Sequence, residues 1–143
     1  MPEHERIAAI KRLREHEAQA QSRVAEQERQ EREDLATWKK TTLPMINHTI
    51  QGVSEDFARR GSPFVFSTVP VQSEGSVFFR VKSTGGLRLL SKLQFDLTAD
   101  GQVIATALVA GVYLPSSVPM KDVTREWVEQ AAEKALIAMI NAV

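Results

Sequence analysis

Residues 92–109 read KLQFDLTADGQVIATALV, and this stretch decides the fold. Before Asp100-Gly101, apolar and polar residues alternate at every second position, which is the pattern of a half-buried strand. Asp100-Gly101 is a dipeptide typical of a tight turn, and a second, largely apolar run follows it. The stretch therefore predicts an antiparallel β-hairpin.

A two-residue loop at Asp100-Gly101 predicts the register of this hairpin. Leu97 would then face Ile104, and Leu93 would face Leu108. The reverse face of the second strand would carry only small apolar side chains, those of Val103, Ala105, Ala107, Val109 and Gly111. We expect such a face to be covered, either by a helix or by another subunit.

The rest of the second part of the chain, residues 41–143, predicts an α+β domain. Apolar spacing predicts helices over 43–60 and 122–142, with Gly61 ending the first. Strands are expected at about 64–71, 76–83, 88–98 and 102–113, with a turn at Gly85-Gly86 and a loop over 116–119. This order predicts a four-stranded antiparallel β-meander with the C-terminal helix packed on the sheet.

The first part of the chain, residues 1–40, predicts an extended charged helix. Residues 3–40 contain no proline or glycine and are rich in strong helix formers. Leu13, Val24 and Leu35 follow an 11-residue spacing, whereas a heptad pattern is poor. Two alternatives stay open: a solvated helix held by charge pairs, or a helix that pairs with itself. Residues 41–44, which end in Pro44, predict a break or kink before the next helix.

Composition narrows the classes of function. The formal net charge is zero, and residues 1–40 and 41–143 each hold nine basic and nine acidic residues, so no nucleic-acid partner is expected. The absence of cysteine excludes disulfides and thiolate metal sites. The longest nearly apolar run, 103–114, is too short to span a membrane, so we expect a cytoplasmic protein. No motif predicts a catalytic, cofactor-binding or metal-binding residue, and we expect no cofactor.

The C-terminal helix suggests either an interface or packing between the sheet and the front helix, because its residues 135–140 are apolar on every side. Together with the front helix and the small-residue strand, it gives a set of candidate interface residues. They are Leu13, Val24, Leu35, Trp38, Ala105, Ala107, Leu136, Ile137, Met139 and Ile140.

These patterns favour a non-enzymatic protein-interaction or assembly module. We expect a homo-oligomer, with a dimer favoured, and a possible protein partner bound through the N-terminal helix. The alternative is an α+β module that binds a small molecule or peptide in an apolar pocket between the sheet and the helices. The candidate pocket residues are Phe64, Phe66, Phe79, Phe95 and Trp127.

Overall fold

The computed structural model describes residues 2–67, 69–83 and 91–142. The chain divides into two units, Met1–Asp34 and Leu35–Val143. The first unit is helical, and the second is an α+β unit with an antiparallel sheet. The α+β class predicted from the sequence is therefore confirmed.

Helix α1 spans Glu3–Thr37. Its residues up to Asp34 lie in the first unit, and its last three residues belong to the second. It has 35 residues, and none of them is buried. A π-helical turn, Trp38–Thr42, joins it to helix α2, Leu43–Arg59. The N–H of Leu43 donates to the carbonyl of Trp38, five residues earlier.

Pro44 explains this local change of helix type. Proline has no N–H, and its ring clashes with the carbonyl four residues earlier in an ordinary α-helix. The wider π turn precedes Pro44, which then lies in the first turn of α2. The predicted break at residues 41–44 is therefore a change of helix type without loss of helical backbone.

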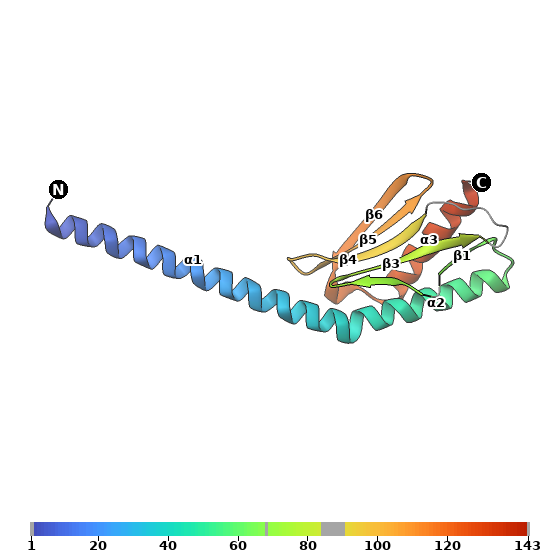
Figure 1. The fold of residues 1–143 in the computed structure, drawn as a ribbon, viewed down its shortest axis with the longest axis horizontal. Helices are drawn as coiled ribbons and strands as arrows, with labels where there is room; N and C mark the ends of the chain where they lie inside the picture. The colour runs from blue at the N-terminus through green and yellow to red at the C-terminus, as the bar shows by residue number, and fades with distance from the viewer. Residues whose placement is uncertain (1, 68, 84–90, 143) are drawn as a thin grey trace. The chain divides into compact units, whose positions relative to one another are not determined.

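Within the described residues the sheet has six strands, where the sequence predicted four. They are β1 (Phe64–Phe66), β2 (Val71–Ser73), β3 (Ser76–Ser83), β4 (Lys92–Leu97), β5 (Gln102–Val109) and β6 (Val112–Pro119). Their order is β1-β3-β4-β5-β6, with β2 also paired to β3, and every pair is antiparallel. Figure 1 shows β3 to β6 side by side.

Two of the predicted strands are each divided in the structure. The predicted strand 64–71 becomes β1, and β2 begins only at its last residue. The predicted strand 102–113 is cut by a turn at Ala110 and Gly111, with φ of 51° and 83°. Alanine rarely adopts positive φ, so the sequence did not indicate a turn at Ala110. Residues 116–119, predicted as a loop, belong to β6.

Of the predicted strand 88–98, the structure describes residues 91–98, and residues 92–97 form β4. The predicted turn at Gly85-Gly86 lies outside the described residues.

The predicted register of the central hairpin is wrong by one residue, because Leu97 pairs with Val103 and not with Ile104. The loop has three residues, since the N–H of Thr98 donates to the carbonyl of Gln102 at 2.8 Å. The Thr98 hydroxyl accepts from the N–H of Gln102 at 3.0 Å and so stabilises the longer loop. Gly101 has the predicted positive φ, 79°, at the position that a three-residue loop requires.

The one-residue difference between the predicted and the observed register exchanges the two faces of β5. Its small residues, Val103, Ala105, Ala107 and Val109, are buried on the same face as Leu93 and Phe95. Ile104 and Leu108 lie on the opposite face and are only partly buried. The small residues therefore face the core. The sequence predicted that this face would be covered by a helix or another subunit.

Helices α2 and α3 (Arg125–Asn141) pack against each other and against the sheet, α2 on β1 and α3 on β5 (Figure 1). The small side chains of β5 let α3 approach the sheet closely. Thr124 caps α3 by accepting a hydrogen bond from the N–H of Trp127 at 3.2 Å. The core between helices and sheet contains Ile46, Phe79, Phe95 and Leu136, each at most 2% exposed.

Candidate functional site

The surface of α1 is the first candidate interaction site. Ile7, Ile10, Leu13 and Val24 are large apolar residues that are 52–60% exposed. At 100° per residue, Ile10, Leu13, Ala20 and Val24 lie within about 80° of one another around the helix axis. We call these four residues the α1 stripe. Glu17 lies in the same arc between Leu13 and Ala20, so the stripe offers separate apolar contacts to another helix and no continuous apolar face.

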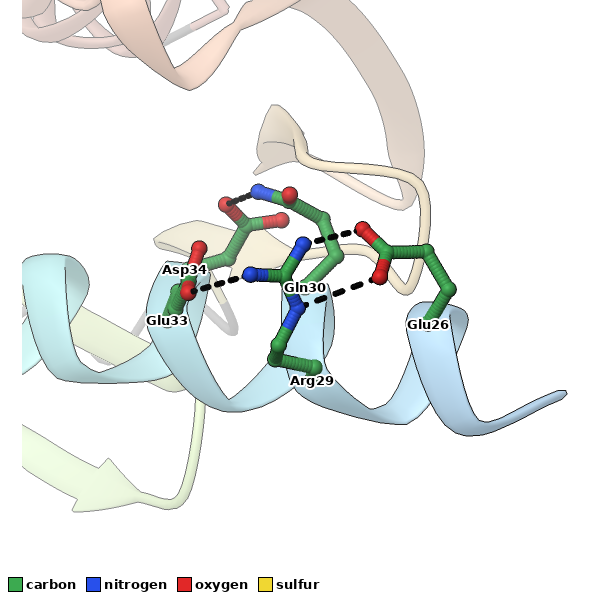
Figure 2. A network of polar contacts seen from close by, with 5 residues as sticks. All are labelled: Glu26, Arg29, Gln30, Glu33 and Asp34. Carbon is green, nitrogen blue, oxygen red and sulfur yellow. Dashed lines mark hydrogen bonds and ion pairs between the residues drawn. The ribbon is translucent and has the colours of Figure 1, made fainter. Parts of the chain in front are cut away.

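Ion pairs stabilise the C-terminal third of the first unit (Figure 2). The Arg29 Nε donates to Glu26 Oε2 at 3.2 Å, and the Arg29 guanidinium also lies 3.7 Å from Glu33 Oε1. Gln30 donates to Asp34 at 3.0 Å. The hydrogen bond to Glu26 is the main cause that raises the pKa of Arg29 above its ordinary value. Because all these groups are exposed, solvent screens the pairs and each contributes little stability.

The N-terminal part of α1, where Arg6, Lys11, Arg12 and Arg14 lie, differs from this C-terminal third in its ion pairs. Across residues 3–34, all of which the structure describes, ion pairs join only Glu26, Arg29 and Glu33. No ion pair within the unit involves Arg6, Lys11, Arg12 or Arg14. Ion pairs within the unit are therefore concentrated at one end of the helix.

The remaining candidate interface residues fall into two groups. Trp38, Ala105, Ala107, Leu136 and Met139 are at most 6% exposed, because they lie in the core of the second unit. Leu35 is partly buried against the same core. Ile137 and Ile140, on the outer side of α3, are 49% and 39% exposed. One chain thus hides two of the four large apolar residues near the end of α3 and leaves two in contact with water.

The β6 edge of the sheet is poorly suited to pairing with another strand. Val109 and Val112 flank a two-residue turn, so they form a hydrogen-bonded pair, and the pairs then alternate along the hairpin. Pro115 and Pro119 fall on the other pairs, where the backbone nitrogen faces away from β5. Proline has no N–H, so two outward donors are missing from this edge.

The β1 edge is closed by serine side chains. The Ser54 hydroxyl, from α2, accepts from the N–H of Phe66 at 2.9 Å and donates to its carbonyl at 3.3 Å. The Ser62 hydroxyl does the same at Phe64, at 3.2 Å and 2.7 Å. The backbone groups of Phe64 and Phe66 are therefore already satisfied, and strand addition there would have to displace both hydroxyls.

The sheet face opposite the helices is amphipathic. Arg80 and Lys92 both lie over the ring of Phe78, at 5.9 Å and 4.9 Å from its centroid. Tyr113, on the edge strand beside Leu108, is 66% exposed. Asp96 accepts hydrogen bonds from Ser76 and Gln94.

Four of the five predicted pocket residues are packed against one another in the described core. Phe66, Phe79, Phe95 and Trp127 form a row of edge-to-face contacts, with centroids 6.4, 6.4 and 6.0 Å apart. Phe64 is also buried, at 1% exposure. This row fills the space between the sheet and the helices.

A cavity of about 390 Å³ lies instead between α2 and the β1–β2 edge. Of the five predicted residues, only Phe66 and Phe79 line it, together with Ile50, Ser54 and Pro70. The sequence did not predict this position, because it depends on the interruption between β1 and β2.

No cluster of three or more His, Cys, Asp or Glu side chains suited to a metal ion occurs among the described residues. None of the described helices is both long enough and apolar enough to cross a membrane. Comparison with protein-family models, curated proteins and solved structures finds no match for this chain.

Proposed function

We propose that this chain is a protein-interaction module that self-associates, with α1 as the assembling helix. The observation that carries the proposal is a 35-residue helix with no buried residue that nevertheless exposes Ile10, Leu13 and Val24. Most helices in proteins are stabilised by packing of an apolar face and not by intrinsic propensity. Burying each of these side chains fully would contribute about 1.5–3 kcal/mol. A partner helix on the α1 stripe would supply that burial.

The sheet edges support the choice of α1. Because Pro115 and Pro119 obstruct the β6 edge and Ser54 and Ser62 obstruct β1, backbone pairing at these two strands is disfavoured. Side-chain packing along a helix needs no free backbone groups. The proposed interface therefore uses a part of the chain that offers exposed apolar side chains on regular backbone.

Light scattering on the full chain tests the proposal. The unmodified chain is expected to form a dimer of about 32 kDa, twice its 15.9 kDa mass. Leu13→Glu with Val24→Glu should convert it to monomer, since both carboxylates would enter the interface. The matched control, Ala8→Glu with Ser22→Glu, adds the same charge on the opposite side of α1 and should leave the dimer intact. A monomer for the unmodified chain at tens of micromolar would refute the proposal.

A second candidate function is binding of a small apolar ligand or peptide side chain in the cavity between α2 and the β1–β2 edge. Its volume of about 390 Å³ and its lining by Ile50, Phe66 and Phe79 favour this candidate. A ligand-observed NMR screen of apolar fragments tests it, with Ala58→Trp as the variant expected to fill the cavity. Equal fragment binding by the unmodified chain and by this variant would exclude the cavity.

A further inference from the structure

The charges of α1 are separated along its length. Residues 6–14 contain four basic and no acidic residues, whereas residues 26–34 contain five acidic and two basic residues. The small residues Ala18, Ala20 and Ser22 lie between these two ends. The helix therefore has a basic end and an acidic end, which we define by residues 6–14 and 26–34.

The internal contacts of the helix do not cancel this separation. Arg29 is held by Glu26 and Glu33 inside the acidic end (Figure 2), which leaves the other carboxylates there in excess. The basic end has no ion pair within its unit. Each end therefore remains available to a surface of opposite charge.

We infer that two copies of α1 pair in antiparallel orientation, so that the basic end of each copy lies along the acidic end of the other. This inference rests on the proposed self-association and adds the orientation of the partner. In a parallel pair, each end would face its own like charge, which is repulsive. The antiparallel pair replaces both repulsions by attractions.

The apolar side chains fit the same orientation. When Leu13 lies beside Val24 of the partner subunit, two-fold symmetry brings the same contact at the other end of the pair. Residues whose numbers have the same sum then lie opposite each other, so Ile10 faces Gln27 and Arg6 faces Glu31 of the partner subunit. The two-fold axis passes between positions 18 and 19, where Ala20 of the α1 stripe permits close approach of the helices.

Cysteine cross-linking tests the orientation directly, because the chain has no cysteine of its own. Two single variants, Ile10→Cys and Gln27→Cys, are purified separately, mixed and oxidised, and the products are identified by mass spectrometry. A disulfide requires Cα atoms within about 7 Å. The antiparallel pair predicts a covalent dimer that contains one copy of each variant. In a parallel pair these positions would be about 25 Å apart along the axis.

The outcomes separate the orientation from the self-association. Disulfide dimers formed by either variant alone, or no mixed dimer from a chain that is dimeric by light scattering, overturn the antiparallel pairing and leave the proposed function standing. A monomeric unmodified chain overturns both.

Salt dependence of the unmodified chain gives a second test that needs no substitution. Antiparallel pairing predicts that the dimer Kd rises between about 0.05 M and about 0.5 M NaCl, because salt screens the attraction. A Kd that falls with salt contradicts the antiparallel orientation, since salt would then be screening repulsion between like charges.

Discussion

Replacing Phe95 by alanine is expected to remove a large part of the stability of the second unit. Phe95 is 0% exposed and lies in the middle of the aromatic row, in edge-to-face contact with Phe79 and Trp127. Loss of a fully buried phenylalanine side chain costs about 3–5 kcal/mol, which includes the cavity left behind. Since domains of this size are stable by about 5–15 kcal/mol, the variant should be folded but markedly weaker.

Urea titration followed by tryptophan fluorescence measures this loss, because the chain has two tryptophans and both lie in or against the core. The matched control is Ile104→Ala, on the neighbouring strand but on the opposite face of the sheet. Ile104 is only partly buried, so its loss should be clearly smaller. A loss below about 1 kcal/mol for Phe95→Ala, or a larger loss for Ile104→Ala, would contradict both the core and the observed register.

Three further predictions test the turn, the β1 edge and the outer side of α3. Gly101→Val should lower the free energy of unfolding by about 1 kcal/mol or more, because a β-branched residue resists the φ of 79°, and an unchanged thermal melt would argue against this turn. Ser54→Ala should lower the free energy of unfolding by about 1–3 kcal/mol, because it leaves the buried N–H of Phe66 without its partner. Ser54→Thr keeps a hydroxyl, so the free energy of unfolding should fall less when its methyl group fits. Ile137→Asp, on the exposed outer side of α3, should leave both the molar mass in light scattering and the far-UV circular dichroism unchanged, because the proposed interface is α1, and a lower mass would place α3 in the interface.

The fold class could be predicted because several elements carry strong periodic patterns. The 3.6-residue spacing of Ile46, Ile50 and Val53 and the two-residue spacing of Leu93 and Phe95 each specify one buried face, and all five are buried. The division into six strands could not be predicted. It depends on the positive φ of Ala110 and on prolines tolerated at an edge, which become visible only when the neighbouring strand is known.

The predicted register of the hairpin was wrong for a related reason. Asp100-Gly101 favours a two-residue loop, but the Thr98 hydroxyl binds the N–H of Gln102 and favours a three-residue loop. Because β5 is apolar at nearly every position, its hydrophobic pattern fits either register equally well. The local hydrogen bonds of Thr98 therefore decide which face becomes the core.

The candidate surfaces were predictable to different degrees. Exposed apolar residues on α1, such as Leu13 and Val24, follow from a helix with too few of them to form a core. The burial of Trp38, Ala105 and Ala107 depends on how the second unit packs, which single-residue patterns do not contain. The cavity beside Ser54 and Pro70 depends on where the edge strand is interrupted.

The obstructed sheet edges have a consequence for crowding. Two chains joined through α1 would hold their sheets at a local concentration of the order of millimolar, far above that of free chains. At such concentrations, strands with open edges recruit one another and grow into cross-β aggregates. The hydroxyls of Ser54 and Ser62 at one border and the rings of Pro115 and Pro119 at the other act as gatekeepers. They would keep the sheets of the two joined chains from pairing with each other through these strands.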